Sequence, residues 1–438
     1  MKRFLFERLP AWLLLGIFLL IVVYAPLTVW LGTVFPGMAV ALKAWKEVLI
    51  GVVLILLLVQ VLHRRQMSRF SSDPFLWLVL AYTVLHLMML GIYPPENAQV
   101  AISGLMIDLR YVLFAAAVYV FLRLYPSYRR RFVTVGIIGA CVVVGFATLE
   151  LVLPKDTLSA IGYGNSTIQP YLTVDKNPDF IRFNSTLRGP NPLGAYAIIA
   201  LAGVVAWTIG KRGQRLSNRQ KALIGVFTLA SIIALWVSYS RSALIGAVIA
   251  LLVLGYAAFG HSLTRRQWLV GLGALLVIGL GIFSVRNTTF FQNVILHDNL
   301  ATGSSVDSNS AHVASLNEAS QAFAVQPLGA GIGSTGSASQ FGTHPMIIEN
   351  QYLMIAHEAG WMGLGLFLTL LGFTMYRLIR MPWTWLSLTV LASGMGLTVV
   401  GLLLPVWADD TVSIVWWGLA AVALIGGNYE RTTNKKTA

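Results

Sequence analysis

The chain has very little cysteine, and this shortage excludes two classes of small, cross-linked protein. Cys141 is the single cysteine among 438 residues, and it lies within an apolar run. One cysteine cannot form a disulfide within its own chain or supply the thiol cluster of a zinc module. A disulfide scaffold and a cysteine-based metal domain are therefore excluded.

Charged residues are also scarce, at 11% of the chain, whereas hydrophobic residues make up 57%. Apolar blocks of ~20 residues recur along the whole length, which is typical of a helical membrane protein and excludes a soluble globular domain. A porin-like barrel is excluded too, because its strands show short alternating segments. The net charge of +14 would suggest nucleic acid in a soluble protein, but here we expect no nucleic-acid partner.

The apolar blocks predict an all-α, polytopic transmembrane helical bundle of about twelve spans, forming a single integral membrane domain over residues 1–438. We read the basic and then apolar N-terminus as the first span, because its apolar part is too long for a removed signal. The predicted spans are 11–32, 47–63, 74–92, 102–124, 132–153, 191–210, 222–239, 241–259, 267–285, 354–376, 384–405 and 411–427.

The positions of the basic residues predict an orientation. If both termini are cytoplasmic, most of the 31 basic residues fall in cytoplasmic segments, as the positive-inside rule requires. Two long connections then lie outside, at about 154–190 and, between spans nine and ten, 286–348. Within the second, residues 312–325 predict an amphipathic helix, and the glycine-rich "QPLGAGIGSTGS" predicts tight turns that let the loop lie against the membrane domain.

Two of the arginines that this orientation places outside, Arg241 and Arg188, are exceptions to the bias whose positions need an explanation. Arg241 lies in "SYSRSALIG" between two apolar spans, where it either meets an anion or carboxylate or snorkels to lipid headgroups. Arg188 precedes "GPNPLGAYAIIA", so it either forms an anion site with the N-terminus of the next helix or simply marks a loop-to-helix entry capped by Asn191.

The acidic candidates lie at the same outer edge. Glu349 comes at the start of a span, where it either acts as a general base or serves the helix dipole. Glu358, nine residues later, faces the opposite side of the helix, so the two do not form a paired-carboxylate site. The pair Asp409–Asp410 occupies a short outer loop, where it either lines an acceptor site or is only solvated, and we prefer the second reading.

Metal binding is not expected. His312, His344 and His357 all lie outside or near the outer edge, together with Glu349. Their spacing matches no standard ligand pattern, so we predict no metal and no cofactor.

Three motifs that follow one another along the chain resemble, as an ordered set, a single family. "RGPNPLGAYAIIA", "SYSRSALIGAVIALL" and "PLGAGIGS…ENQYLMIAHEAGWMGLGLF" together resemble the O-antigen ligase and O-antigen polymerase superfamily, over roughly residues 185–370 by motif and the whole chain by topology. The resemblance implies a GT-C-like bundle in the bacterial inner membrane, with its active site on the periplasmic face.

The resemblance also implies an activity and a set of residues. It implies a metal-independent, inverting glycosyl transfer from undecaprenyl pyrophosphate to a sugar hydroxyl on a glycan or lipid-linked acceptor. Arg241 matches the family's first pyrophosphate-binding arginine, and His312 stands where a second family arginine usually precedes the loop helix. Arg188, from the reading of the residues above, is a further pyrophosphate-binding candidate. The family's common His-Asn at the loop exit is here Glu349-Asn350, which are the catalytic candidates.

Three other functions stay open. A polymerase of the same superfamily is not separated from a ligase by these motifs. A flippase of lipid-linked sugars would need polar residues within the spans, and the sequence offers Asp108 and Arg110 in the fourth span. A scaffold or sensor without catalysis is the third.

Overall fold

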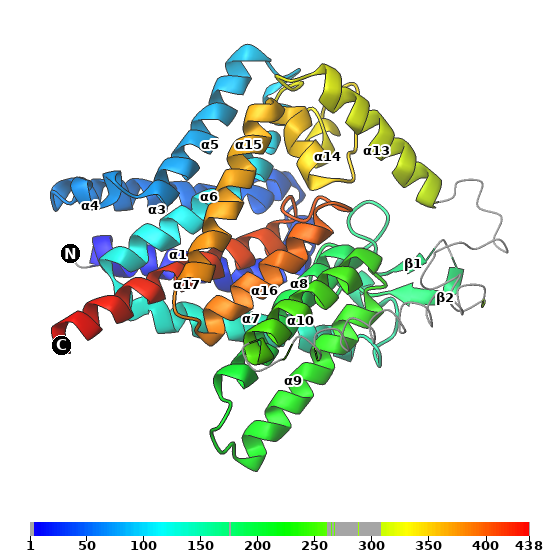
Figure 1. Ribbon diagram of the computed structural model, residues 1–438. Helices are drawn as coiled ribbons and strands as arrows, with labels where there is room; N and C mark the ends of the chain where they lie inside the picture. Colours follow the sequence, from blue (N-terminus) through cyan, green and yellow to red (C-terminus); the bar gives the residue numbers. More distant parts are fainter. Residues whose placement is uncertain are drawn as a thin grey trace.

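The computed structural model describes residues 4–174, 177–260 and 308–437, together with the isolated positions 264, 267 and 288. Within these ranges the chain is mostly helical (Figure 1). The first half contains α1 (Leu9–Leu20), α2 (Tyr24–Val34), α3 (Ala39–His63), α4 (Met67–Ser71), α5 (Pro74–Ile92), α6 (Ala98–Leu124) and α7 (Arg129–Leu149). The second half contains α8 (Pro190–Gly210), α9 (Asn218–Val237), α10 (Arg241–Phe259), α13 (Ser308–Val325), α14 (Gly336–Ser339), α15 (Gln351–Arg380), α16 (Trp385–Val400) and α17 (Asp410–Thr437).

Nine helical stretches in the described part of the chain are long and apolar enough to cross a membrane, so this is a multi-pass membrane protein. Two shorter apolar helices, Trp385–Val400 and Asp410–Gly426, lie where the last two spans were predicted. The predicted span 267–285 falls outside the described residues, apart from position 267.

The structure corrects two predicted boundaries. Helix α3 begins at Ala39, not at 47, so that Lys46 and Glu47 lie inside it. These charges are tolerated inside the helix because Lys46 pairs with Glu47 and Asp410, and Glu47 also pairs with Arg110, which offsets the penalty of burying them. Helix α16 ends at Val400 rather than 405, because the chain turns there toward α17.

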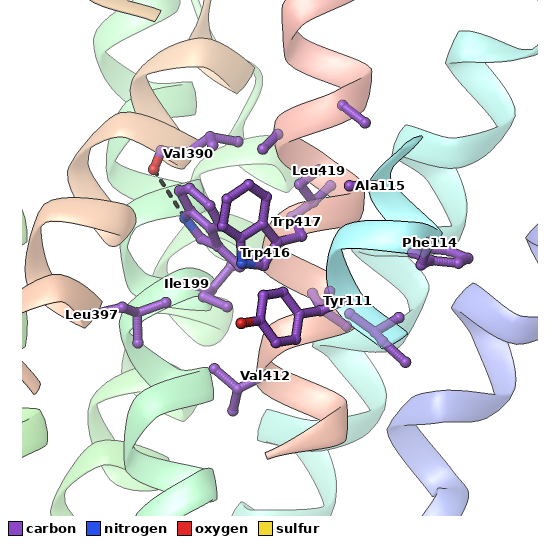
Figure 2. Close-up of a cluster of buried hydrophobic side chains, with 14 of the residues drawn as sticks. Tyr111, Phe114, Ala115, Ile199, Val390, Leu397, Val412, Trp416, Trp417 and Leu419 are labelled. Carbon is purple, nitrogen blue, oxygen red and sulfur yellow. Dashed lines mark hydrogen bonds between the residues drawn. The ribbon is translucent and has the colours of Figure 1, made fainter. Parts of the chain in front are cut away.

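Helices α6 and α17 form the centre of the bundle. Trp407, Trp416 and Trp417 are fully buried, and their rings contact one another with centroids 5.0–6.1 Å apart. Figure 2 shows Trp416 and Trp417 between Tyr111 of α6 and Val390 of α16, whose carbonyl accepts a hydrogen bond from Trp416 Nε1 at 3.1 Å. Aromatic packing therefore joins α6, in the first third of the chain, to the C-terminal helices.

Helices α8, α10 and α16 pack closely through small residues. A Cβ at Gly396 would lie 2.3 Å from the Gly246 carbonyl oxygen, so the backbones of α16 and α10 touch there. Glycine at such a crossing lets helices approach closely in a lipid environment, where apolar side chains alone provide little driving force.

The two long connections carry short elements. Strands β1 (Leu172–Val174) and β2 (Asn177–Arg182) form an antiparallel hairpin that the sequence did not predict, and the helix predicted at 312–325 is confirmed as α13. In Figure 1 the hairpin and α13 lie at the side of the bundle opposite the beginning of α1 and the end of α17.

The glycine-rich segment packs onto the membrane domain, as predicted. Gly360 breaks α15 with φ +68, and the carbonyls of His357 and Glu358 accept hydrogen bonds from the amides of Ala330 and Gly331 instead. Four glycines between 329 and 336 have positive φ, a conformation that costs glycine little. The segment is thus locked into the kink of α15.

Candidate functional site

The connection between α16 and α17, residues 401–409, is the centre of the candidate site. The amide of Gln351 donates to the Gly401 carbonyl at 2.8 Å, and Gln351 Oε1 accepts from the amides of Trp407 at 2.7 Å and Ala408 at 3.1 Å. The beginning of α15 is therefore held against this connection.

Asn350 has a clear structural role within this arrangement. Its Oδ1 accepts from the amides of Tyr352 at 2.9 Å and Leu353 at 3.0 Å, which caps α15, and its Nδ2 donates to the Leu402 carbonyl at 2.8 Å. With these bonds made, Asn350 positions its neighbour Glu349 rather than offering a free amide. Glu349 itself is partly buried, directly before the cap.

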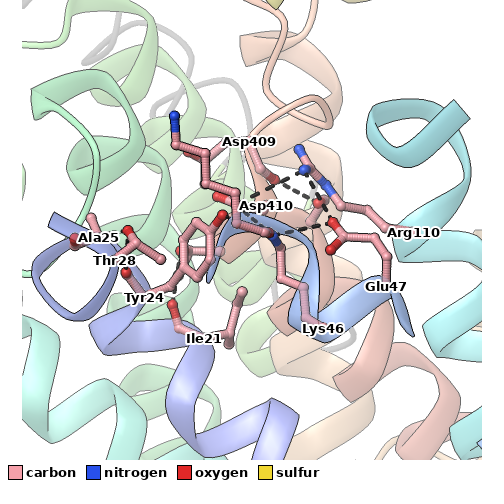
Figure 3. A network of polar contacts seen from close by, with 12 residues as sticks. Ile21, Tyr24, Ala25, Thr28, Lys46, Glu47, Arg110, Asp409 and Asp410 are labelled. Carbon is pink, nitrogen blue, oxygen red and sulfur yellow. Dashed lines mark hydrogen bonds and ion pairs between the residues drawn. The ribbon is translucent and has the colours of Figure 1, made fainter. Parts of the chain in front are cut away.

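A buried network of charges lies at the other end of the same connection (Figure 3). Lys46 Nζ lies 3.1 Å from Glu47 Oε1 and 3.4 Å from Asp410 Oδ2. Arg110 Nη1 lies 3.7 Å from the same Glu47 oxygen and 3.9 Å from the same Asp410 oxygen, and its Nη2 donates to the Ala408 carbonyl. Helices α3, α6 and α17 are joined here by ion pairs.

The reading of Asp409–Asp410 as a solvated pair was wrong. Asp410 is 1% exposed because it lies between Lys46 and Arg110. Asp409 is partly buried, and its Oδ1 accepts from the Val412 amide at 2.9 Å, one of the unpaired amides in the first turn of α17. Burial raises the pKa of Asp409 to about 6, and the neighbouring charge of Asp410 adds to this effect.

Arg188 faces this acidic pair. Its side chain is exposed, and within the described residues it makes no hydrogen bond or ion pair of its own. The charge of Asp410, followed by that of Asp409, raises the pKa of Arg188. Arg188 is thus a cation with free donors beside the α16–α17 connection.

The segment leading to Arg188 is rigidly held. Ser185 donates from its amide to Glu150 at 2.8 Å and from its hydroxyl to the Val143 carbonyl at 2.7 Å, while the Thr186 hydroxyl donates to the Val22 carbonyl at 2.5 Å. Burial raises the pKa of Glu150 to about 7, although the bond from Ser185 opposes this. These contacts tie residues 185 and 186 to the end of α7 and to the turn Ile21–Val23 between α1 and α2.

Arg241 begins α10 at the same end of the bundle. The turn before it packs against α8, because a Cβ on Gly194 would lie 2.8 Å from Ser238 Oγ and 2.9 Å from Ser240 Cβ. Arg182 fastens the turn by donating to the Ser238 carbonyl at 3.0 Å and to Asn191 Oδ1 at 2.7 Å. Asn191 therefore serves Arg182, and α8 has no side-chain cap.

The beginning of α10 also reaches the α16–α17 connection. A Cβ on Gly246 would lie 2.7 Å from Val400 Cγ2, at the end of α16. Of the five predicted site residues, Arg188, Arg241, Glu349 and Asn350 thus lie on segments that converge on residues 401–409. His312 lies in the first turns of α13, and its side chain is outside the described residues.

Sequence reasoning missed a second polar group inside the bundle. Glu358 is 2% exposed and accepts from the Thr335 amide at 3.3 Å, with the Asp108 carboxyl next to it. His86 Nε2 lies 3.6 Å from Asp108 Oδ2. The prediction that Glu358 does not pair with Glu349 holds, and its partner comes from α6. The signals available in the sequence were Asp108 within the fourth predicted span and a histidine, His86, within the third.

Among the residues that the structure describes, no group of three or more histidine, cysteine, aspartate or glutamate side chains has the geometry to hold a metal ion. A scan of the sequence against protein-family models finds no match, and a search among curated proteins finds no similar sequence.

Proposed function

We propose that the protein is a metal-independent, inverting glycosyltransferase in the bacterial cytoplasmic membrane. It moves a glycan from undecaprenyl pyrophosphate to a sugar hydroxyl on the outer face, as the resemblance to O-antigen ligases implies. In this proposal twelve spans form a GT-C-like bundle and both termini are cytoplasmic.

The observation that carries the proposal is the position of Arg188. It is an exposed guanidinium without a hydrogen-bond partner among the described residues, on a segment held by three hydrogen bonds. A rigid arginine with free donors suits a pyrophosphate, which it binds through two parallel hydrogen bonds. The N-terminus of α8 begins two residues later, and the positive end of its helix dipole favours an anion as well.

The surrounding charges explain why the site would select an anion with more than one charge. Lys46 and Arg110 are already paired with Glu47 and Asp410, so they do not offer free charge. The charges of Asp410 and Asp409 attract Arg188, but Arg188 forms no ion pair with them in the described structure. A pyrophosphate can displace that weak attraction, whereas a neutral headgroup cannot.

The reaction then needs one base and no metal. Glu349 removes the proton from the acceptor hydroxyl as its oxygen attacks the anomeric carbon. The bond from that carbon to the pyrophosphate oxygen breaks, and the electron pair leaves with the lipid pyrophosphate. Arg188 and Arg241, joined in the proposal by His312, neutralise the charge that develops there. A single displacement inverts the anomeric carbon.

The test uses purified protein in nanodiscs with an undecaprenyl-pyrophosphate glycan, in EDTA and without nucleotide. Release of lipid pyrophosphate and formation of glycan product are measured for wild type, Glu349→Gln and Arg188→Ala. We expect Glu349→Gln to lower turnover by about 10²–10⁴-fold with donor binding nearly unchanged, because general-base assistance has that size. Arg188→Ala and Arg241→Ala should weaken donor binding, by about 10- to 100-fold each.

Lys155→Ala is the matched control, since Lys155 is an exposed cation in the connection that also contains Arg188. It should leave donor binding and turnover unchanged. Equal loss of binding and turnover in Glu349→Gln would count against its role as base. Absence of product from a folded wild-type protein that binds donor and is offered several acceptors would contradict glycosyl transfer.

Buried charge inside the spans favours a second candidate, a flippase of lipid-linked sugars. Lys46, Asp410 and Glu358 are 1–2% exposed, and membrane spans seldom carry such residues unless they serve a pathway or a pair. Movement of a labelled lipid-linked glycan across proteoliposomes, without product, would favour this function. Product without movement favours the transferase, and the acceptor it needs separates ligase from polymerase.

A further inference from the structure

A polar cleft lies beside the glycine-rich segment, on the same face as Glu349. It has a volume of 740 Å³ and is bounded by the α5–α6 connection, residues 330–334 and residues 342–347. This volume lies within the usual range of small-molecule sites, roughly 300–1,000 Å³. Ile347 lines it, two residues before Glu349. None of the described residues in the proposed mechanism lines this cleft.

Two carboxylates line the cleft from separate elements. Glu96, in the α5–α6 connection, accepts hydrogen bonds from the Thr343 amide at 2.6 Å and the Thr343 hydroxyl at 3.0 Å. The bond from the Thr343 amide lowers the pKa of Glu96, so it is ionised at neutral pH. Glu318, on α13, is exposed. His344 and His357 also line the cleft, so its walls carry two carboxylates and are acidic when these two histidines are neutral.

Two buried polar atoms at the cleft have no hydrogen-bond partner in the described part of the chain. One is Nδ1 of His357, whose side chain is only 8% exposed, and the other is the hydroxyl of Ser334. An unsatisfied buried polar atom is unfavourable by about 1–3 kcal/mol. A ligand with hydroxyl or amino groups would satisfy both atoms.

The floor of the cleft is rigid. Ala330 and Gly331 donate to the carbonyls of His357 and Glu358 at 2.6 and 3.2 Å, and a Cβ on Gly331 would lie 2.9 Å from Tyr93 Cβ. A preformed site loses less conformational entropy on binding, which favours a weak, polar ligand such as a sugar. The Tyr93 side chain adds a ring to the lining, a common partner for the apolar faces of sugars.

We propose that this cleft binds the acceptor glycan, and that it accepts neutral or amino sugars and rejects acidic ones. Hydroxyl and amino groups donate to Glu96 and Glu318, while His357 and Ser334 bind the remaining polar groups. A phosphorylated or uronic sugar would meet two carboxylates and be repelled. The donor's pyrophosphate is kept out for the same reason and stays at the arginines. The identification of the bound sugar as the acceptor rests on the proposed function.

The experiment measures binding without donor, in full-length wild-type protein in nanodiscs. Saturation-transfer NMR titrations use three trimers: glucosamine, N-acetylglucosamine and galacturonate. We expect the glucosamine trimer to bind best, the neutral trimer next, and the galacturonate trimer roughly tenfold more weakly than the first. Glu318→Gln should reduce that tenfold difference by about half or more.

Asp156→Asn is the matched control, because Asp156 is an exposed carboxylate in the other outer connection and does not line the cleft. It should leave the preference unchanged. Ser334→Ala should weaken the neutral trimer several-fold through the loss of one hydrogen bond. Any of three results would overturn the proposal. The first is no NMR saturation transfer to either non-acidic trimer, and the second is a preference for the galacturonate trimer. The third is an equal effect of Glu318→Gln and Asp156→Asn on the preference.

The two proposals can fail separately. Trimer binding with the expected preference, but no release of lipid pyrophosphate, contradicts glycosyl transfer and supports the sugar site. Release of lipid pyrophosphate without trimer binding overturns the cleft and leaves the transferase standing.

Discussion

At the scale of single residues, the site is decided by which cations already have partners. Lys46 and Arg110 contact Asp410 at 3.4 and 3.9 Å and serve to hold helices together. Breaking such a buried pair from one side leaves an uncompensated charge, which is strongly destabilising. Arg188 has no such contact in the described structure, which is why we propose it as the donor-binding cation.

If Arg188 binds the donor pyrophosphate as proposed, Asp409 should make that binding depend on pH. Burial raises its pKa to about 6, so the carboxylate competes for Arg188 above that pH and is neutral below it. We expect donor affinity in wild type to increase as the pH falls from 8 to 5. Asp409→Asn should bind donor more tightly than wild type at pH 8 and should lose the part of the pH dependence that Asp409 causes, as measured by donor titration at each pH; the dependence that remains is the contribution of His312.

The same group affects stability in a predictable direction. Because its folded-state pKa lies above the usual value of about 3.9, folding favours the protonated form. Asp409 therefore lowers stability as the pH rises from about 4 to about 6, and Asp409→Asn should remove that part of the pH dependence of thermal unfolding. Asp156→Asn, with an exposed carboxylate, should keep the wild-type profile in both measurements. Wild-type profiles for Asp409→Asn would contradict this account.

At the scale of elements, the glycine-rich segment and the kink of α15 form one unit. Gly360 frees the carbonyls of His357 and Glu358, and the amides of Ala330 and Gly331 occupy them. Gly333 then contacts the beginning of α6, where a Cβ would lie 2.6 Å from the Val100 carbonyl oxygen. This contact places the floor of the sugar cleft beside the α5–α6 connection.

Gly333→Ala should therefore destabilise the protein by about 2–4 kcal/mol, since it combines a positive φ of +80 with overpacking against a backbone oxygen. Gly213→Ala provides the control. Gly213 has φ +83, and a Cβ there would meet no atom of the described chain within 4 Å. Gly213→Ala should lower the free energy of unfolding by only about 1 kcal/mol, because only the positive φ contributes. Apparent Tm values in detergent measure both, and equal shifts would show that crowding at Val100 has no effect.

At the scale of the whole molecule, the beginning of α1 and the end of α17 lie at one side of the bundle, and β1, β2 and α13 lie at the other (Figure 1). The segments with Arg188, Arg241 and Glu349 reach the second side through the α16–α17 connection. Basic residues predict that the first side is cytoplasmic. The predicted membrane orientation thus rests on the positions of the basic residues, and the proposed site rests on the fold.

Cysteine labelling tests this orientation. Cys141 is the single native cysteine, so Cys141→Ala provides a thiol-free background. Asn165→Cys and Arg215→Cys introduce exposed thiols in two connections. In intact cells a membrane-impermeant maleimide should label position 165 and leave 215 unlabelled, and permeabilised cells should show both. The reverse pattern would contradict cytoplasmic termini.

Local patterns determined the elements of this protein. Apolar blocks of about one membrane thickness predicted the long helices, and the positions of basic residues predicted their direction, because both signals are read within one segment. The amphipathic pattern at 312–325 predicted α13, and the glycines at 329–336 predicted a loop that lies against the membrane domain. The motifs also directed attention to Arg188, Arg241 and Glu349.

Only the tertiary structure decided which of these residues act together. Arg110 meets Ala408 across 298 positions of sequence, and Lys46 meets Asp410 across a longer stretch still. A local sequence pattern contains no information on such a distant pairing. Asp410 was therefore predicted to be solvated although it is buried, and the partner of Glu358, Asp108, was not predicted. A helix pattern tells which face is apolar, whereas the energy of a buried charge depends on the partner that the fold places beside it.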